Sequence, residues 1–400
     1  MSEQQRYRVI KRLASGGMAE VFVAESAGIE GFRKQVAIKR VLPQLSKKEQ
    51  FIAMFLDEAR LSAHLSHSNV VSVFDIGVGD GTYFIVMEYV EGADLKAVMD
   101  HAKKTGLNIP VEAAVYVATR ICQGLAYAHE LRDREGKPLQ IIHRDITPAN
   151  VLITRYGEVK IVDFGLAKAS SQLAESDAGV IKGKFGYLAP ETVLEKPVDQ
   201  RVDVFAVGII LWEMLTGRRL FLGETDFQTV RQVRDAVIPP LPQINRAVPP
   251  ELDELVRRAL ARDPDTRYQN ARDLGRDLTR FLYRFGRPVG DDDVAELVMR
   301  AVGVTNAAAP VDGTKKIAEM IDLVLLEFRS LTKEGQDGNG SPNFAEELSF
   351  QSSPPPPNDD GDVDTPLGGL ADELEGPDPV PTAQEDSSSV AGWFRGLISR

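Results

Sequence analysis

Apolar and polar residues alternate in short runs through the first ninety positions, which is the period of half-buried strands. The alternation predicts strands at 7–13, 21–24, 35–41, 70–76 and 83–90. Between the third and the fourth of these, at Phe51–Leu65, apolar residues recur with the period of a helix. The N-terminal part of the chain is therefore predicted to be rich in strands, with one helix.

Longer apolar stripes follow and predict a helical part. Val111–Leu131 is striped over its whole length, and the longest apolar run, Val204–Leu215, predicts a buried helix that Asp203 opens. That run is too short to span a bilayer and contains Glu213, so no transmembrane segment is expected.

A helical extension is predicted at 286–332, with helices at 291–301 and 314–331. The second helix is amphipathic, and its apolar stripe consists of Ile317, Met320, Ile321, Val324, Leu325 and Phe328. Packing on the main domain is favoured over dimerisation for this stripe. Residues 333–389 are acidic and rich in Pro and Ser and are predicted to be disordered, while 390–400 form a short apolar motif.

The composition is that of a globular protein with an acidic tail. The chain has 400 residues, of which 43% are hydrophobic, enough for one large domain with extensions. Its only cysteine, Cys122, cannot form an intrachain disulfide, and its first residues carry no apolar segment, so a cytoplasmic protein is expected. The net charge is −12, but 14 acidic residues and no Lys or Arg lie between Glu334 and Val390. The remainder is close to neutral, and no basic run indicates nucleic-acid binding.

Candidate chemistry lies in the middle of the chain. Two apolar pieces, Val151–Thr154 and Val159–Val162, are joined by a Gly-containing turn and predict a hairpin. The outer ends of a hairpin meet, so Asn150 is expected beside Asp163. Their side-chain oxygens suit Mg²⁺, which takes its remaining ligands from water and phosphates. Asp145 is then free to orient a hydroxyl nucleophile.

The order of these residues resembles the catalytic and metal loops of the bacterial eukaryotic-like (Hanks-type) protein kinases. The matching motifs are His143-Arg144-Asp145, then Asn150, then Asp163-Phe164-Gly165. The resemblance covers 7–285 and implies an α+β, two-lobed protein-kinase fold. Its N-lobe (7–88) would be a five-stranded antiparallel sheet with one helix, and its C-lobe (91–285) would be mostly helical. It also implies a serine/threonine protein kinase that uses ATP and Mg²⁺.

A glycine-rich turn between the first two strands is expected to cover the nucleotide phosphates. Its residues are Leu13, Ala14, Ser15, Gly16, Gly17, Met18, Ala19, Glu20 and Val21. The family pattern is G-x-G-x-x-G-x-V. Gly16 matches the second glycine, and alanines stand in the places of the first and the third. The methyl groups stiffen the loop and leave backbone N–H groups available near Gly16.

The third strand carries V-A-I-K, in which Ala37 precedes the candidate ion-pair lysine Lys39. Glu58 lies on the inward face of the predicted helix, where a buried carboxylate needs a partner. Pairing with Glu58 would hold Lys39 on the α- and β-phosphates, as the resemblance implies. A surface lysine on an edge strand is the alternative for Lys39.

The fifth strand ends in M-E-Y-V, which resembles the kinase hinge. The resemblance places Met87 at the back of the adenine pocket and the backbone of Glu88 to Val90 against the adenine. Asp94 is expected to cap the next helix, and in the family such a residue can reach the ribose.

Three residues further along are implied by the resemblance to hold the C-lobe together. Gly183–Glu191 resembles the end of an activation segment. Arg267 would pair with Glu191, and an exposed surface pair is the alternative. Asp203 would fix the backbone of the catalytic loop. His129, like Cys122, is expected to be structural.

Two departures from the family occur together. Thr147 stands where the Ser/Thr members usually have Lys, and Lys184 stands where they usually have Thr. Our hypothesis is an exchange, in which Lys184 supplies the ammonium group to the γ-phosphate and Asp145, and Thr147 supplies the hydroxyl. The alternative is that Lys184 is a solvated loop residue.

No arginine stands at 147–149, where tyrosine kinases carry one, so Ser/Thr substrates are favoured. Arg144 beside the catalytic Asp marks the type whose activation segment is ordered by phosphorylation. The candidate acceptors are Ser170, Ser171 and Ser176.

Two rival functions remain. The altered glycine loop and Thr147 are the grounds for a pseudokinase scaffold or nucleotide-binding module that acts through its acidic tail and the motif at 390–400. The presence of Lys39, Asp145, Asn150 and Asp163 argues against it. That motif could bind a protein partner or, less favourably, a membrane surface. A small-molecule kinase is disfavoured by the complete Ala-Pro-Glu segment, which shapes a peptide-binding platform.

Overall fold

The structure is a computed structural model that describes residues 6–16, 18–27, 33–79, 81–164, 185–307 and 327–330. The chain divides into two compact units. Every described residue belongs to the unit that comprises 1–332 and 388–400.

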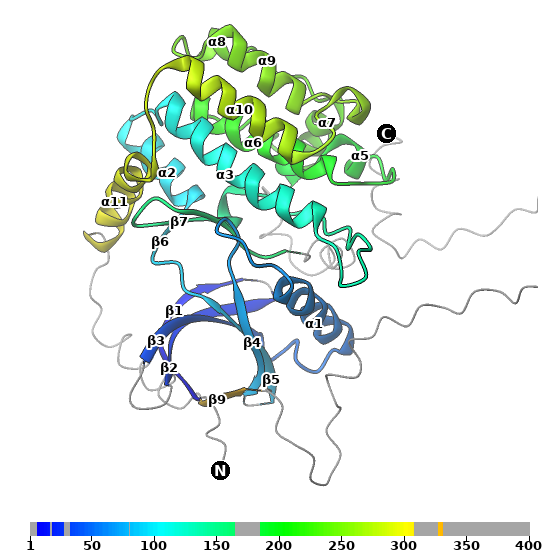
Figure 1. Ribbon diagram of the computed structural model, residues 1–400, viewed down its shortest axis with the longest axis vertical. Helices are drawn as coiled ribbons and strands as arrows, with labels where there is room; N and C mark the ends of the chain where they lie inside the picture. The colour runs from blue at the N-terminus through cyan, green and yellow to red at the C-terminus, as the bar shows by residue number, and fades with distance from the viewer. Residues whose placement is uncertain are drawn as a thin grey trace, which may run out of the picture. The chain divides into compact units, whose positions relative to one another are not determined.

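The N-lobe contains the five predicted strands and the predicted helix (Figure 1). The strands are β1 (Arg6–Ser15), β2 (Ala19–Ala27), β3 (Arg33–Val41), β4 (Val73–Gly79) and β5 (Thr82–Glu88). They pair antiparallel in the order β1-β2-β3-β5-β4. The helix is α1 (Glu49–Ala63). Phe22, Ile38, Phe84 and their neighbours are buried on one sheet face, as the alternation requires.

A sixth short strand, β9 (Glu327–Ser330), closes the sheet into a barrel. It pairs antiparallel with the start of β1 and the end of β4. The helix predicted at 314–331 is therefore wrong for its last turn, and Phe328 belongs to a strand. The edges of β1 and β4 offer backbone hydrogen bonds, and strand pairing overrides a local helical period. The other residues of that prediction, 314–326, lie outside the described part.

The C-lobe is mostly helical (Figure 1). Its helices are α2 (Leu95–Thr105), α3 (Val111–Glu130), α5 (Pro190–Val193), α6 (Arg201–Thr216), α7 (Asp226–Asp235), α8 (Leu241–Ile244), α9 (Pro250–Ala259), α10 (Ala271–Phe285) and α11 (Asp291–Ala307). Three 3₁₀ turns are η2 (Pro148–Asn150), η3 (Phe185–Tyr187) and η4 (Pro264–Thr266). A small antiparallel sheet consists of β6 (Gly92–Asp94), β7 (Val151–Thr154) and β8 (Val159–Ile161).

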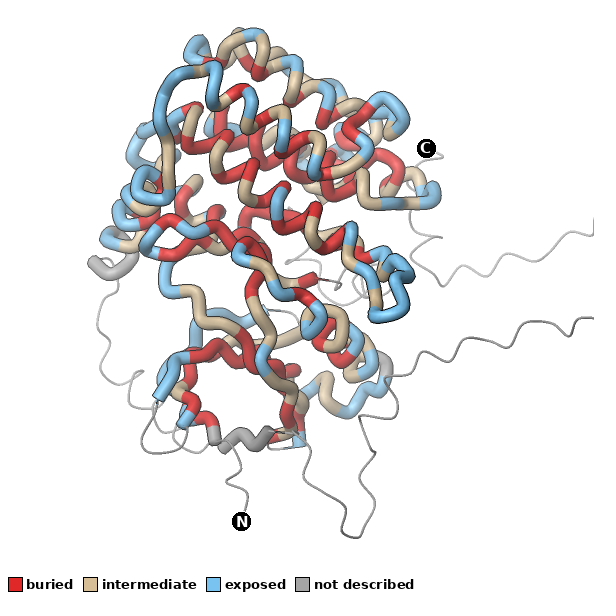
Figure 2. The backbone as a smooth tube through the Cα atoms, viewed as in Figure 1, coloured by how far each residue is buried: buried red, intermediate tan, exposed pale blue. Residues whose placement is uncertain are grey.

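Helix α6 is the centre of the C-lobe core. Every residue from Val202 to Leu215 is buried, including Asp203 and Glu213, and Figure 2 shows buried residues gathered along the interior of the helical lobe. Helix α3 packs against α6 and α10. At Gly275 an added Cβ would lie 2.9 Å from the Cβ of Cys122, so this glycine permits the close approach of α10 to α3. Cys122 is buried and structural, as expected.

Helix α11 begins at Asp291 as predicted and continues to Ala307, beyond the predicted end. Val294, Val298 and Ala301 are buried and join the C-lobe core. The helix contacts α2, β6 and β7. None of the helices that the structure describes combines the length and the apolar character needed to cross a bilayer.

Candidate active site

A lysine from the N-lobe is held between two carboxylates. Lys39 extends from β3, which lies between β2 and β5 in the sheet. Its Nζ donates to Oε1 of Glu58 on α1 at 2.7 Å and to Oδ1 of Asp163 at 2.9 Å. The side chain of Lys39 is 7% exposed, so the alternative of a surface lysine is wrong. The predicted pair of Lys39 with Glu58 is present.

Burial and mutual charge set the protonation of this cluster. Burial alone would lower the pKa of Lys39, but Asp163 and Glu58 outweigh that effect and raise it above its usual value. Burial raises the pKa of Glu58 to about 7, although Lys39 opposes this. Oε2 of Glu58 is buried and accepts no hydrogen bond from any described residue. The cluster therefore holds the ammonium of Lys39 between two carboxyl groups, of which Glu58 has a pKa near neutrality.

The catalytic loop, which contains His143, Arg144 and Asp145, is held in place by Asp203 of α6. Its carboxylate accepts from the backbone N–H of His143 and of Arg144, each at 2.8 Å, and binds Nε2 of His129 at 2.8 Å. Arg144 has a φ of 65°, in the left-handed region that costs energy for a residue with a Cβ. Two bonds from the loop backbone to this buried carboxylate hold the loop in that conformation, and His129 of α3 binds the same carboxylate. The implied role of Asp203 and the structural role of His129 both agree with this geometry.

Asp145 and Asn150 contact each other. Nδ2 of Asn150 donates to the backbone oxygen of Asp145 at 2.8 Å and to its Oδ2 at 3.1 Å. The backbone N–H of Asp145 lies 3.2 Å from Nδ1 of His143. Asp145 is thus oriented from two sides, with its carboxylate partly exposed.

The predicted hairpin of β7 and β8 brings Asn150 to the Asp163 loop. Val151 faces Ile161 in the register, and the N–H of Val162 donates to the backbone oxygen of Asn150 at 3.0 Å. Asp163 has a φ of 67° and a side chain that is 26% exposed. This geometry presents its carboxylate at the surface between the two lobes.

The side-chain oxygens of Asn150 and Asp163 fit a magnesium ion that takes its remaining ligands from phosphates and water. Among the described residues, no cluster of three or more His, Cys, Asp or Glu side chains could hold a metal alone. Asn150 and Asp163 supply an amide oxygen and a carboxylate on adjoining loops. Hard oxygen ligands in that small number are what Mg²⁺ uses when phosphates and water complete its shell.

Phe164 directly follows Asp163, the candidate metal ligand, and packs in the core. Its ring is 2% exposed and lies 4.5 Å, centroid to centroid, from the ring of His143. Nε2 of His143 lies 3.0 Å from the backbone oxygen of Val162. The residue before Asp163 and the residue after it are therefore both tied to the catalytic loop.

An apolar surface beside Lys39 contains residues from both lobes. Ala37, Val71 and Met87 are buried there, and the residues packed against them are Val21, Val73, Tyr89, Val90, Leu152 and Val162. The sequence predicted Val21, Ala37, Met87 and Val90 for the nucleotide site, with Met87 and the backbone of Val90 at the adenine, but missed Leu152 and Val162. Leu152 lies within β7 and Val162 directly follows β8, and their apolar character in the predicted hairpin was the available signal. Only the tertiary fold packs them against Ala37 and Met87 of the N-lobe.

The remaining nucleotide candidates lie around this surface. Leu13, Ala14 and Ser15 end β1, and Ala19, Glu20 and Val21 begin β2. Gly16 donates its N–H to the oxygen of Ala19 at 2.9 Å, and Met18 completes the described turn, whereas Gly17 lies outside the described residues.

Glu88 and Asp94 flank the hinge. Glu88 ends β5, donates its N–H to the oxygen of Ser72 at 2.8 Å and pairs through Oε1 with Lys160 of β8 at 2.9 Å. Asp94 caps α2 as predicted and accepts from the N–H of Ala97 at 2.7 Å. Burial raises the pKa of Asp94, although the bond from Ala97 opposes this.

The structure describes only one of the two residues in the proposed exchange of Thr147 and Lys184. Thr147 is 8% exposed and accepts from the N–H of Asn150 at 3.0 Å through its backbone oxygen. Lys184 lies outside the described residues, as do Gly165 and the candidate acceptors Ser170, Ser171 and Ser176.

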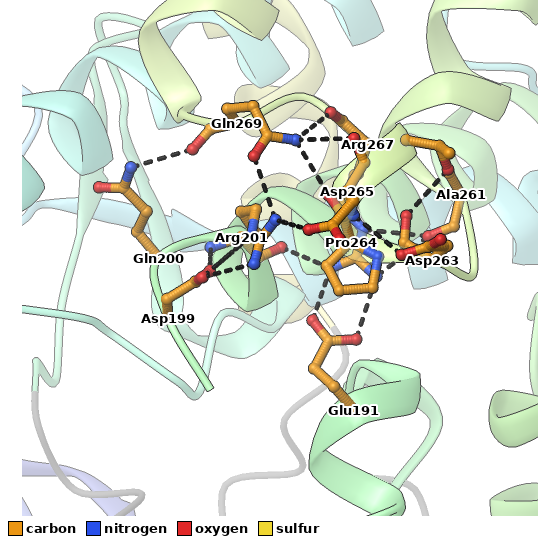
Figure 3. A network of polar contacts seen from close by, with 11 residues as sticks. Glu191, Asp199, Gln200, Arg201, Ala261, Asp263, Pro264, Asp265, Arg267 and Gln269 are labelled. Atoms are coloured by element: carbon orange, nitrogen blue, oxygen red, sulfur yellow. Dashed lines mark hydrogen bonds and ion pairs between the residues drawn. The ribbon is translucent and has the colours of Figure 1, made fainter. Parts of the chain in front are cut away.

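Arg267 anchors the turn after the activation segment (Figure 3). Its Nη1 and Nη2 donate to the two carboxylate oxygens of Glu191 at 2.7 and 3.1 Å. The side chains are 0% and 5% exposed, so the alternative of an exposed pair is wrong. Further bonds to the backbone oxygens of Ala261 and Arg201 satisfy the guanidinium.

A strand-rich lobe, a helical lobe and a lysine held by a carboxylate from each define the protein kinase class. The family described as "Protein kinase domain" matches residues 7–276, and the chain belongs to that family. The prediction of a bacterial eukaryotic-like kinase fold is confirmed at this level.

Several curated proteins and solved structures are similar. The tyrosine-protein kinase MasK of Myxococcus xanthus is 40% identical over 276 residues, 69% of this chain and 43% of that protein. The serine/threonine-protein kinase PrkC of Bacillus subtilis is 35% identical over 273 residues, 68% of this chain and 40% of that protein. The chain thus spans less than half the length of these two relatives. The kinase domain of PknI of Mycobacterium tuberculosis superposes with a TM-score of 0.51 and 26% identity, over 68% of this chain and 95% of that one.

Proposed function

We propose that this chain transfers the γ-phosphoryl group of ATP to serine and threonine hydroxyls of proteins. The observation that carries the proposal is Lys39, an N-lobe cation held at hydrogen-bond distance by Glu58 and by Asp163 of the C-lobe. Phosphoryl transfer needs little covalent chemistry from a protein, and its catalysts act by positioning and by placing charge.

Each side chain has one task in this proposal. Lys39 binds the α- and β-phosphates, and Glu58 keeps its ammonium pointed at them. Asn150 and Asp163 would hold Mg²⁺, which supplies charge neutralisation on the phosphates when bound. Asp145 orients the attacking hydroxyl and accepts its proton, and the bonds from Asn150 fix the carboxylate for that task.

The nucleotide base is proposed to bind at the apolar surface next to the hinge. Val21 and Ala37 would cover one face of the adenine, and Leu152 the other. The backbone of Glu88 to Val90 would bind its edge. Asp94 would reach the ribose from the start of α2, where its carboxylate is half-buried. The turn at 13–21, with its two alanines, would cover the phosphates.

The hydroxyl specificity has two candidates. The absence of arginine from 147–149 and the name of PrkC, a serine/threonine-protein kinase that is 35% identical over 273 residues, favour Ser/Thr. The name of MasK, a tyrosine-protein kinase that is 40% identical over 276 residues, favours tyrosine. Hydrolysis of the phosphorylated product and separation of phosphoserine, phosphothreonine and phosphotyrosine decides between them, and phosphotyrosine alone would contradict our proposal.

The test of activity is transfer of labelled phosphate from ATP and Mg²⁺ to a generic protein substrate. We expect the wild type to be active and Asp145→Asn to lose about 100-fold or more of its rate. Because Asn has the shape of Asp, the fold should be unchanged by circular dichroism. Equal rates for the two proteins would instead favour the pseudokinase scaffold.

We further propose that Lys184 replaces the lysine that Thr147 displaces. The matched experiment compares Lys184→Ala with Lys182→Ala, which removes a nearby lysine of the same segment. Lys184→Ala should lose about 100-fold or more, because phosphoryl transfer depends on placed charge. The double substitution Thr147→Lys with Lys184→Thr should recover part of that loss. Full activity in Lys184→Ala would show that the residue is a solvated lysine.

Activation by phosphorylation is proposed for the segment between Asp163 and Glu191. Arg144 has a buried Nε that donates to no described residue, so its guanidinium has capacity for an anion. A phosphate on Ser170, Ser171 or Ser176 would supply one. Mass spectrometry after incubation with ATP should find at least one of them modified, and none in Asp145→Asn.

The domain bounds, location and partners remain proposals. A kinase domain at 7–285 would be followed by the extension at 286–332, the acidic tail at 333–389 and the motif at 390–400. The single buried Cys122 supports a cytoplasmic location. A protein partner is proposed for the tail and the motif, and co-purification with and without 390–400 tests it.

A further inference from the structure

A buried carboxylate outside the catalytic cluster lies at the end of α6. Glu213 is 0% exposed, and burial raises its pKa, although Arg219 opposes this. Nε of Arg219 lies 3.0 Å from its Oε1, and the N–H of Leu220 donates to the same oxygen at 3.0 Å. Oε2 accepts from the hydroxyl of Tyr187 at 2.8 Å. One buried anion therefore joins α6 to the loop that follows it and to η3.

Arg219 contacts both Tyr187 and Glu213. Its guanidinium carbon lies 4.5 Å from the centroid of the Tyr187 ring, within the range of a cation–π contact. The same side chain balances the charge of Glu213. It is 31% exposed, so part of the guanidinium reaches the surface. Arg219 is thus the residue that ties the ring of Tyr187 to the carboxylate beneath it.

The backbone packs as closely here as the side chains do. An added Cβ at Gly186 would lie 2.5 Å from the backbone oxygen of Phe221 and 2.9 Å from Nη2 of Arg219. No side chain fits at that position without displacing the backbone of the loop after α6. The loop therefore packs directly on η3.

The element held in this way is the start of the platform, which we define as 185–191. Arg267 fixes its far end through Glu191 of α5. Arg219 and Glu213 fix its near end through Tyr187 of η3. None of the contacts of Arg219 described above includes Lys39, Glu58, Asp163 or the apolar surface at the hinge. The two ion pairs hold the two ends of one short segment.

We infer that Arg219 is a positioning residue for the protein substrate, acting through Tyr187 and Glu213 on the platform. The inference rests on the proposed function, in which a peptide lies on this segment. Without the arginine, the buried carboxyl group of Glu213 loses the cation beside it, and Tyr187 loses the group that covers its ring. The platform can then leave α6, which weakens binding of the protein substrate and leaves ATP binding unaffected.

The experiment compares Arg219→Ala with Arg218→Ala in the full chain. Arg218 is the adjacent arginine, it is exposed, and its side chain forms no ion pair with any described residue. Steady-state rates are measured against a generic protein substrate and, separately, against ATP. We expect Arg219→Ala to raise KM for the protein about tenfold, with KM for ATP within about twofold of wild type. Arg218→Ala should match the wild type in both.

A second substitution, which replaces Glu213 by a neutral residue, distinguishes a positioning role of Arg219 from a general loss of structure. In the double substitution Arg219→Ala with Glu213→Gln, the amide oxygen can accept from the N–H of Leu220 and the amide NH2 can donate to the hydroxyl oxygen of Tyr187, so no carboxylate is left without a cation. This variant should recover part of the protein KM relative to Arg219→Ala alone. Arg219→Gln serves as the second single variant if the alanine protein does not fold.

The outcomes separate this inference from the proposed function. A wild type without activity contradicts the proposed function. An active wild type with unchanged protein KM in Arg219→Ala or Arg219→Gln overturns the role of Arg219. Equal increases in both KM values, or no recovery on adding Glu213→Gln, would overturn it as well.

Discussion

Glu58 is the residue whose protonation can be read out directly as activity. Burial raises its pKa to about 7, whereas an unfolded glutamate has a pKa near 4.5. The folded state therefore holds this proton more tightly, so the contribution of Glu58 to folding stability is largest below pH 4.5 and is lost as pH rises through 7. Its ionised form is nevertheless the one that holds Lys39.

Activity should therefore fall on the acidic side of neutrality. We expect kcat/KM for ATP to decline below about pH 7, because protonated Glu58 no longer attracts the ammonium of Lys39. A pH profile measured on wild type and on Glu58→Gln tests this. The glutamine variant should be slower and should lack the acidic limb, and an identical limb in both proteins would assign the titration to another group.

The buried pair of Arg267 and Glu191 should contribute to stability far more than an exposed pair does. Removing one partner of a buried pair costs about 3–5 kcal/mol, because the other charge remains buried and uncompensated. The matched control is Arg272→Ala, which breaks an exposed pair with Glu130 and should cost about 1 kcal/mol or less. Chemical denaturation of Arg267→Ala and Arg272→Ala measures the difference, and equal losses would contradict the argument.

At the scale of single residues, motifs in the sequence proposed Lys39, Asp145, Asn150 and Asp163, and the helical period of 51–65 proposed Glu58. The structure brings Lys39, Glu58 and Asp163 into contact and places Asn150 against Asp145. The motifs did not indicate whether a given side chain is buried or exposed. The same spacing between Glu191 and Arg267 is compatible with a surface pair or with a buried one, and only the packing of α5 under the loop before α10 decides between them.

Among the elements, α11 lies beyond the family match, which ends at residue 276, and packs on the C-lobe core. Its first turn carries three aspartates, which favour a helix N-terminus, and that signal made its start predictable. Tyr116 of α3 donates its hydroxyl to Asp291 at 2.8 Å. The oxygen of Asp291 also lies where a Cβ on Gly157 would be, so β7–β8 and α11 touch through backbone.

We expect α11 to support the nucleotide site, because it contacts α2 and β6, which carry the cap residue Asp94. Val298→Asp buries a charge at a position that is 0% exposed and should cost about 3 kcal/mol or more and raise KM for ATP. The neighbouring Met299→Asp, at a position that is 55% exposed, is the matched control and should change neither. If Val298→Asp folds and its KM for ATP equals that of the wild type, α11 has a structural role only.

The elements also explain where the sequence failed. The residues of β9 lie in a stripe with helical period, and their strand conformation comes from partners more than 240 positions earlier in the chain. A local period contains no information about such a distant edge. The strands β1 to β5 were predictable from their short apolar runs, although β2, β3 and β5 are buried on both faces at their centres.

For the whole molecule, the connection between the lobes is the property to test. Lys39 and Glu58 belong to one lobe and Asp163 to the other, while Glu88 and Lys160 form a second ion pair across the hinge. A ligand that binds only the folded protein stabilises it, by about 2.7 kcal/mol at a hundredfold excess over its dissociation constant. ATP with Mg²⁺ should therefore raise the melting temperature of the wild type by several degrees.

Two isosteric substitutions localise that effect. Asp163→Asn removes the carboxylate proposed for the metal and should abolish most of the shift. Asp145→Asn changes a carboxylate proposed to contact the hydroxyl substrate and should leave the shift close to that of the wild type. Differential scanning fluorimetry with and without Mg²⁺ measures both, and a full shift in Asp163→Asn would remove that residue from the nucleotide site.

The strand β9 has a consequence for association. Open sheets have two outer strands whose unpaired amides can capture an extended segment from another polypeptide. In this lobe β9 covers part of both margins, because it pairs with Arg6–Arg8 of β1 and with Gly77 and Val78 of β4. At these positions the backbone amides of the outer strands are already paired within the same chain. Cutting the chain before residue 327 would expose both margins and should make the shortened protein prone to self-association.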